Sequence, residues 1–213
     1  MQRGRVSDIA TALPRRTQRD RREATVARLV DATIDSLLAV GYARTSVKEV
    51  CLRAGVSHGG LFRHFDTMLD LIMAAAEEVA RRQIENAERG LAQAVDGEDP
   101  LVTALYRIRD ACRAPINAVF YELVVAARTD PLLHRALVGF STRYADAIAA
   151  ATARMPGVGK LPPDLLGVIV SSALHLFDGE ALTRSVLQFP ELEERRMGLL
   201  VNLVKSLVRS YAA

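Results

Sequence analysis

Residues 45–65 constrain the fold of this 213-residue chain more than any other stretch. Ser46 is followed three residues later by Glu49, which is the spacing of a capping box, so we expect a helix to begin at about residue 47. Apolar residues then recur at helical spacing as far as Gly55, and a glycine suits the left-handed position that follows a helix. The first short helix is therefore predicted to end near Ala54.

A second short helix is expected directly after this glycine. Ser57 can cap it, and Leu61 and Phe65 would lie on its buried side. The same periodicity turns four residues outward, namely His58, Gly59, Phe62 and Arg63. Two helices joined by a turn of roughly three to four residues that contains Gly form a helix-turn-helix, an element that reads DNA.

The stretch resembles the tetracycline-repressor (TetR) family of transcriptional regulators. Family members carry a long amphipathic helix that ends in Gly-aromatic, then Thr-Thr/Ser-Val, Ala-Gly-Val-Ser and a recognition helix of the type Lys-Gly-Thr-Leu-Tyr-x-His/Tyr-Phe. The corresponding segments here are Gly41-Tyr42, Thr45-Ser46-Val47, Ala54-Gly55-Val56-Ser57 and His58-Gly59-Gly60-Leu61-Phe62-Arg63-His64-Phe65. The match is strong over residues 24–72 and general in character, helix for helix, over the remainder.

The resemblance implies a set of DNA contacts within this motif. The predicted residues are Thr45, Ser46, Ser57, His58, Gly59, Gly60, Phe62, Arg63 and His64. Arg15 and Arg16 join them from a basic arm, because arginine-rich arms beside a helix-turn-helix can follow phosphates or enter a narrow minor groove. A solubilising tail without DNA contacts is the alternative for this arm, and an ordinary surface residue is the alternative for each histidine.

Four positions depart from the family pattern. His58 stands in place of Lys, Gly60 in place of Thr, Phe62 in place of Tyr, and Met68 in place of Lys. These changes remove polar or permanently charged groups, so phosphate binding is expected to be weaker. Arg63 can compensate, because arginine reads guanine bidentately or clamps a phosphate.

Composition and charge agree with a helical, two-part protein. Half of the residues (50%) are hydrophobic, only 5% are aromatic and strand-like alternation is scarce, which favours an all-α fold with a sizeable core. Residues 1–65 hold 12 Lys or Arg and 6 Asp or Glu, whereas residues 66–213 hold 16 and 19. A basic N-terminal part on a mildly acidic body suits a DNA-binding module, although a solvated charged face explains the asymmetry about as well.

About nine helices are expected, which is the number typical of the family. Outside the motif they cover residues 19–40, 66–91, 100–113, 115–128, 131–154, 163–188 and 191–211. Proline precedes or begins several of them, and Asp99 and Asp130 are natural N-caps. The expected organisation is a basic arm at 1–18, a helix-turn-helix domain at 19–67 and a helical ligand-binding and dimerisation domain at 68–213.

The last two helices are the most apolar, and each is apolar on more than one face. The resemblance implies that they meet their symmetry mates in a homodimer, and the alternative is that both are simply core helices. The middle helices carry scattered polar and aromatic residues that could line a cavity for a small-molecule effector. These candidates are Arg109, Cys112, Asn117, Phe120, Tyr121, Tyr144 and His175, and each could instead be a satisfied core or surface residue.

The chain lacks the sequence patterns of the commonest enzyme sites. We find no phosphate-binding Gly loop, zinc-protease pattern or nucleophile elbow, and the two cysteines have no metal-site spacing, so no enzyme, metal or cofactor is expected. No signal peptide or membrane-spanning run is expected either, which predicts a cytoplasmic protein. The leading hypothesis is a ligand-responsive regulator of operator DNA, most often a repressor in this family. The rivals are an enzyme on a helical scaffold and an interaction or ligand-binding protein with a weakened DNA-binding head.

Overall fold

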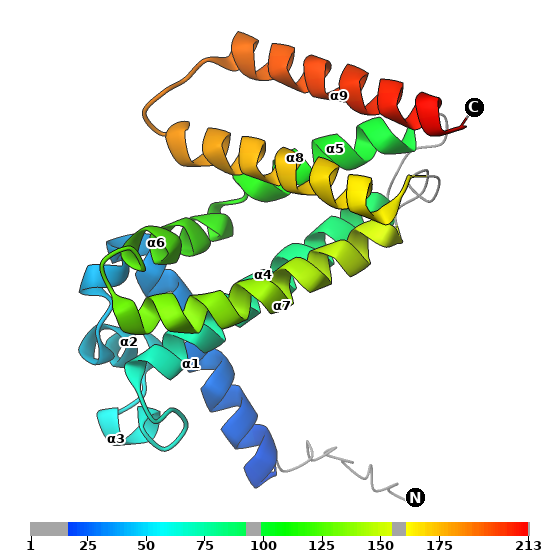
Figure 1. Cartoon of the computed structure of the whole chain (residues 1–213). Coiled ribbons are helices and arrows are strands. Elements are labelled where there is room, and N and C mark those ends of the chain that lie inside the picture. The colour runs from blue at the N-terminus through cyan, green and yellow to red at the C-terminus, as the bar shows by residue number, and fades with distance from the viewer. Residues whose placement is uncertain (1–16, 93–98, 155–160, 213) are drawn as a thin grey trace, which may run out of the picture.

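The computed structural model describes residues 17–92, 99–154 and 161–212. These residues form nine α-helices and two 3₁₀-helices and contain no strand, which confirms the all-α class. Figure 1 shows their arrangement. Residues 1–16 of the basic arm, with Arg15 and Arg16, lie outside the described residues, as do parts of the loops expected before residue 100 and at 155–162.

Helix α1 (Gln18–Val40) begins with a complete capping box between Thr17 and Asp20, in which each side chain accepts the other residue's amide at 3.1 and 2.8 Å. It ends, as predicted, at Gly41, whose φ is 76°. Leu38, near its end, is 42% exposed. The buried position nearby belongs to Ser36, a small residue that fits close to the turn after α1.

The motif helices are α2 (Val47–Ala54) and α3 (His58–Leu61), which follow the 3₁₀-helix η1 (Tyr42–Arg44). Ser46 caps α2 by accepting the Glu49 amide at 3.3 Å, while the Glu49 carboxylate pairs with Arg53 at 2.7 Å instead of completing the box. Gly55 adopts the left-handed conformation with φ 62°. We refer to residues 17–67 as the head and to the later helices as the body.

Helix α4 (Met68–Ala92) joins the head to the body. A capping box marks its start, because Thr67 and Asp70 accept each other's amides at 3.1 and 2.9 Å. It packs against α1, and Arg82 on α4 forms an ion pair with Asp31 on α1. One continuous helix therefore runs from the head into the body (Figure 1).

The remaining helices begin at prolines or just after them. They are α5 (Pro100–Arg113), η2 (Pro115–Asn117), α6 (Ala118–Ala126), α7 (Pro131–Ala153), α8 (Pro163–Thr183) and α9 (Pro190–Ala212). The predicted caps are confirmed: Asp99 accepts the Leu101 amide at 3.0 Å, and Asp130 accepts the Leu132 amide at 3.0 Å. Helix α8 ends five residues before the predicted residue 188, because residues 184–189 form the turn that leads to Pro190.

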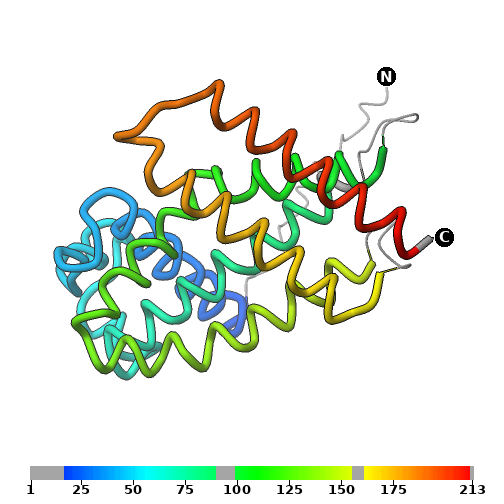
Figure 2. Tube along the Cα trace, turned by 45° about the horizontal axis from the view of Figure 1, so that its top comes forward, coloured from blue at the N-terminus to red at the C-terminus, as the bar shows by residue number. Residues whose placement is uncertain are grey.

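Among the described residues, buried apolar side chains form two clusters. Cluster 1 joins the head to α4, α6 and α7, and cluster 2 joins α5, α8 and α9. Their fully buried members include Leu29, Leu61, Leu71, Val119, Leu123 and Leu133 in cluster 1, and Ala173, Phe177, Met197 and Val204 in cluster 2. The head thus shares one core with half of the body. Figures 1 and 2 show α8 and α9 side by side at the end of the molecule away from α3.

Buried ion pairs also hold cluster 2 together. Arg113 on α5 reaches Glu180 on α8 at 3.2 Å and Glu193 on α9 at 2.7 Å. Glu180 and Glu193 are almost fully buried, so removing Arg113 would leave uncompensated charge in the interior. This network fixes how α8 and α9 sit on α5.

By length and composition, α8 is the one helix in the described part of the chain that could cross a membrane. However, α8 packs on α5 and buries the charged side chain of Glu180 within cluster 2. We interpret its composition as that of a helix with apolar contacts on more than one face.

Candidate nucleic-acid interface and ligand cavity

The surface of α3 carries the residues that were predicted to face DNA. Ser57 caps the helix by accepting the Gly60 amide at 3.1 Å, and Leu61 is completely buried under it. This anchoring turns His58, Gly59, Phe62 and Arg63 to solvent, as the periodicity predicts. Helix α3 ends at Leu61, four residues before the expected Phe65, so Phe62 and Arg63 lie in the turn that follows it. Phe62 is 47% exposed although it is aromatic, so α3 and this turn together present a mixed apolar and cationic face.

Gly60 has a structural role within the motif. A Cβ atom there would lie 2.8 Å from Val56 Cγ1 and 3.2 Å from Ser57 Oγ, whereas a Cβ at Gly59 would meet no atom within 4 Å. The turn between α2 and α3 therefore packs directly onto Gly60. This contact gives a local reason for the glycine where the family pattern has Thr.

A shallow groove with basic walls lies between the residues that follow α3 and the first turns of α1. It is lined by Gln18, Arg19, Arg21, Arg22, Thr25, Arg63 and His64. Arg19 pairs with Glu23 at 2.8 Å, while none of the ion pairs among the described residues uses Arg21, Arg22 or Arg63. We call Arg21, Arg22, Arg63 and His64 the basic groove; the sequence motif pointed to the last two only.

Thr45 does not present its side chain to solvent. It is 8% exposed, and its hydroxyl donates to the Gly41 carbonyl at 2.8 Å and lies 3.0 Å from Ser36 Oγ. Its predicted side-chain contact with DNA is therefore corrected to a structural role. Ser46, the neighbouring N-cap, remains exposed.

Tyr42 fills the corner between head and body. Its amide donates to Glu122 Oε1 on α6 at 2.7 Å, and its hydroxyl donates to Asp130 Oδ2 at 2.6 Å. Burial, with a smaller contribution from Asp130, raises the pKa of Tyr42 to about 12. Because its hydroxyl donates to Asp130, Tyr42 is not counted among the candidate DNA contacts.

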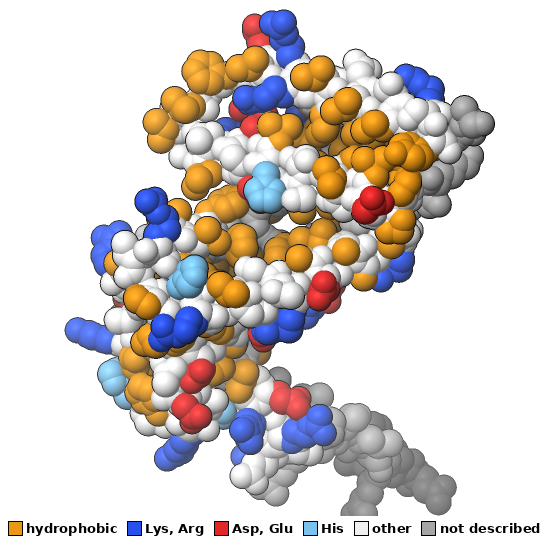
Figure 3. Space-filling view, in the orientation of Figure 1, with side chains coloured by type: hydrophobic (Ala, Val, Ile, Leu, Met, Phe, Trp, Pro, Cys, Tyr) orange, Lys and Arg blue, Asp and Glu red, His pale blue; other side chains and the backbone are white. Residues whose placement is uncertain are grey.

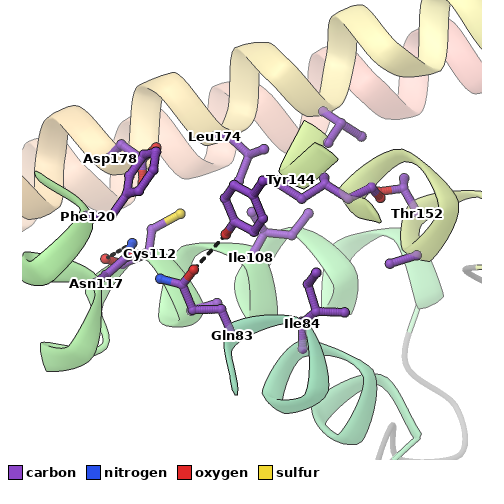
Figure 4. A pocket seen from close by; sticks show the side chains of 15 residues that line it. Gln83, Ile84, Ile108, Cys112, Asn117, Phe120, Tyr144, Thr152, Leu174 and Asp178 are labelled. Atoms are coloured by element: carbon purple, nitrogen blue, oxygen red, sulfur yellow. Dashed lines mark hydrogen bonds between the residues drawn. The ribbon is translucent and has the colours of Figure 1, made fainter. Parts of the chain in front are cut away.

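A cavity of about 110 Å³ lies between the two clusters, bounded by α4, α5, η2, α6, α7 and α8 (Figure 4). Four predicted residues line it: Cys112, Asn117, Phe120 and Tyr144. The lining residues that sequence reasoning missed are Gln83, Ile84, Ala87, Ile108, Ala111, Ile148, Ala151, Thr152, Val170, Leu174 and Asp178. A signal for α8 existed, because Val170, Leu174 and Asp178 recur every four residues and place a carboxylate on an apolar helical face.

Polar groups at the cavity bond to one another. Tyr121 donates to Asp178 Oδ1 at 2.6 Å, Asn117 donates to the Cys112 carbonyl at 3.0 Å, and Tyr144 donates to Gln83 Oε1 at 2.6 Å. Burial raises the pKa of the Cys112 thiol, the Tyr121 phenol and the Tyr144 phenol, and the charge of Asp178 raises all three further. These groups therefore keep their protons at neutral pH.

Three predicted pocket residues do not line the cavity. Arg109 turns toward α9, where it pairs with Glu194 at 2.7 Å. Tyr121 is not a lining residue, but its hydroxyl donates a hydrogen bond to Asp178, which is one. His175 is exposed, and its Nδ1 lies 2.6 Å from the Ser171 carbonyl, because it sits on the outer face of α8.

The head and the exposed face of α3 define a helix-turn-helix protein of the DNA-binding class. Residues 29–75 match the family model of the bacterial regulatory proteins, tetR family. The chain is 46% identical over 189 residues to the uncharacterized HTH-type transcriptional regulator Rv2912c of Mycobacterium tuberculosis, covering 89% of this chain and 97% of that protein. It is 30% identical over 123 residues to the HTH-type transcriptional regulator CymR of Pseudomonas putida, covering 58% and 61%.

Solved structures share the fold. The multidrug binding protein EbrR, solved in complex with imidazole, matches with a TM-score of 0.61 and 23% identity over 84% of this chain and 93% of that chain. A transcriptional regulator from Rhodococcus sp. Rha1 matches with a TM-score of 0.64 and 24% identity over 84% and 94%. The chain belongs to the TetR family of HTH-type transcriptional regulators, a family of soluble regulators that are not enzymes.

Proposed function

We propose that this chain is a homodimeric, cytoplasmic repressor that a small-molecule effector releases from operator DNA. The observation that carries this proposal is the course of α4. Its first turns pack in cluster 1 through Leu71 and Ile72, whereas Gln83 and Ile84, further along the same helix, line the cavity. A ligand that shifts the cavity wall would therefore displace a helix that supports the DNA-binding head.

The proposed DNA surface is α3 together with the basic groove. His58, Gly59 and Phe62 would meet base edges or the nearby backbone, and Arg63 is the residue best suited to read guanine. Arg21 and Arg22 would bind phosphate beside it, since neither forms an ion pair in the described part of the chain. Nδ1 of His64 is buried and without a partner there, so a phosphate contact by this ring would use Nε2.

The proposed dimer forms through α8 and α9. Both helices leave large apolar side chains exposed, including Val168 at 62%, Leu199 at 71% and Leu203 at 56%. In a two-fold dimer the same patch lies on both subunits, so these residues would cover one another. Two recognition helices would then face half-sites about 34–36 Å apart on a near-palindromic operator.

The effector would bind in the cavity beside α4. Its walls are mostly apolar with a few polar groups, as in small-molecule sites generally, although about 110 Å³ admits only a compact ligand unless the walls move. EbrR, which shares the fold, is described as a multidrug binding protein and was solved with imidazole. We retain the division into a basic arm at 1–18, a DNA-binding domain at 19–67 and a ligand-binding and dimerisation domain at 68–213 as part of this proposal.

Selection of bound fragments from random-sequence DNA by the full chain tests the DNA-binding part. Enrichment of a near-palindrome, bound more weakly as salt rises, is the expected result. Failure to enrich any sequence at low salt would favour the rival hypothesis, an interaction protein with a weakened head. This rival rests on the departures from the family pattern at His58, Gly60, Phe62 and Met68.

A further inference from the structure

The cavity between the two clusters is lined by a negatively charged side chain and by no positively charged one. Of the fifteen residues that line it, Asp178 carries the one carboxylate, and none is Lys, Arg or His. Arg109 and Arg113 on α5 and Arg196 on α9 pair with other carboxylates, namely Glu180, Glu193 and Glu194. None of the ion pairs within the described residues uses Asp178. A negative charge therefore borders an apolar cavity without a counter-ion.

The neighbouring polar groups do not replace a counter-ion. The Tyr121 hydroxyl donates to Asp178 Oδ1 at 2.6 Å, but it is neutral. The Asn117 amide is occupied by the Cys112 carbonyl at 3.0 Å and by the Tyr121 hydroxyl at 2.8 Å. Hydrogen bonds from neutral donors reduce the cost of burying a carboxylate, whereas a cation would also offset its charge.

Two further donors at the cavity are directed elsewhere. The Tyr144 hydroxyl donates to Gln83 Oε1 at 2.6 Å, and the Thr152 hydroxyl donates to the Ile148 carbonyl at 2.8 Å. The charge of Asp178 also reaches across the cavity, because it contributes to raising the pKa of Tyr144 on α7. The cavity thus favours a ligand that brings both a positive charge and hydrogen-bond donors.

Aromatic rings complete the environment. Phe120 and Tyr144 both line the cavity, with ring centroids 5.9 Å apart, and Phe140 packs behind them at 6.1 and 5.6 Å. Figure 4 shows Asp178 beside Phe120, with Tyr144 projecting toward Gln83. Aromatic faces attract organic cations, and more strongly where water is excluded.

We infer that the ligand of this cavity is a compact organic cation, a protonated amine on a small apolar body, whose charged group binds Asp178 and whose apolar part contacts Phe120 and Tyr144. This inference rests on the proposed effector site and names its ligand class. The size limit follows from the volume: an apolar cavity of about 150 Å³ holds benzene, and the cavity here measures about 110 Å³. A branched alkyl amine is thus the expected scale, and a benzyl-type amine, which is larger than benzene, fits only if the walls move.

Matched probes of different charge test this inference. Isobutylammonium, isobutanol and isobutyrate, and likewise benzylammonium, benzyl alcohol and benzoate, are titrated calorimetrically into the full chain at neutral pH. The wild type should bind each amine at least about tenfold more tightly than its alcohol, a difference of about 1.4 kcal/mol, and should bind the carboxylates most weakly. In Asp178→Asn the preference for the amine should fall to about twofold or less, while the affinity for the alcohols stays the same.

Asp164→Asn is the matched control, because it removes a carboxylate from an exposed position of the same helix. It should keep the wild-type preference. Equal or tighter binding of the alcohol or the carboxylate by the wild type would overturn the inference and leave the effector site standing. Failure of every probe to bind would overturn both the inference and the proposed effector site, while the DNA selection above would remain an independent test of the head.

Discussion

The Tyr42 hydroxyl donates a 2.6 Å hydrogen bond to Oδ2 of Asp130, while Oδ1 of the same aspartate accepts the first amides of α7 at 3.0 Å. Glu122 on α6 accepts the Tyr42 amide at 2.7 Å. Gly41, the residue before Tyr42, must be glycine, because its φ is positive and a Cβ there would lie 2.7 Å from Glu122 Oε1. The end of α1 is therefore tied to two body helices at one point.

Tyr42→Phe should lower the free energy of unfolding by about 1.5 kcal/mol, because it removes a half-buried hydrogen bond to a carboxylate and leaves the ring in place. Urea unfolding of the full chain measures this. Tyr211→Phe is the control, since Tyr211 is 53% exposed, and it should stay within about 0.5 kcal/mol of the wild type. Equal stabilities of the two variants would show that the Tyr42 bond contributes nothing.

The same variant should change how stability depends on alkaline pH. The pKa of Tyr42 is raised from its ordinary 10 to about 12 in the folded chain, so the folded state holds a proton that the unfolded state has lost. Its contribution is therefore complete below about pH 10 and is lost as pH rises from about 10 to about 12. The free energy of unfolding should fall less steeply across this window in Tyr42→Phe than in the wild type, and parallel curves would refute the assignment.

Arg63→Ala should weaken operator binding by about 1 to 3 kcal/mol and relax the sequence preference at one base pair, if Arg63 reads a base. Fluorescence anisotropy on the selected operator and on variants of it measures both effects. Arg107→Ala, an exposed arginine on α5 outside the proposed DNA surface, should bind like the wild type. An equal loss on every DNA sequence would reassign Arg63 to phosphate, and unchanged affinity would remove it from the interface.

Gly59→Ala and Gly60→Ala should change stability in opposite directions. Alanine at Gly59 meets no neighbour and improves helix propensity, so the free energy of unfolding should rise by up to about 1 kcal/mol. Alanine at Gly60 would press on Val56, and the strain should lower stability by about 1 kcal/mol or more. Thermal unfolding that ranks Gly60→Ala at or above Gly59→Ala would contradict the packing described for the motif.

Leu203→Asp should convert the proposed dimer into monomers, because a charge introduced once appears twice in a two-fold interface. Leu203 is a better site than Leu200, which packs against cluster 2 and would also disturb the core. Leu132→Asp, at a 61% exposed position on α7, is the control and should leave the assembly unchanged. Analytical sedimentation that finds a stable wild-type monomer at micromolar concentration would refute the dimer.

Local signals in the sequence predicted much of the fold. Capping residues and helix-starting prolines are short-range features, and they placed α2 and α5 at the observed bounds and the caps Asp99 and Asp130 correctly. Helix periodicity also predicted which residues of the second motif helix are exposed, because it placed them opposite Leu61, which is completely buried.

Sites that depend on contacts between distant helices were predicted less well. Arg109 and Tyr121 have the right chemistry for a cavity wall, but their partners Glu194 and Asp178 lie 85 and 57 residues further along the chain and draw them elsewhere. Thr45 matches a DNA-contacting motif, yet the close approach of Ser36 buries it. The periodicity of a single helix cannot reveal these pairings, because each joins residues of different elements.

The most direct test of the account is the coupling between ligand and operator. The tightest-binding member of the amine panel is titrated into the free chain and into the chain saturated with its selected operator. A coupling of about 1 to 3 kcal/mol predicts that operator DNA weakens ligand binding by about 5- to 150-fold, and by reciprocity the ligand must weaken operator binding by the same factor. Equal ligand affinities in the two titrations would show a bound molecule that does not regulate DNA binding, and would contradict the proposal of a ligand-responsive repressor.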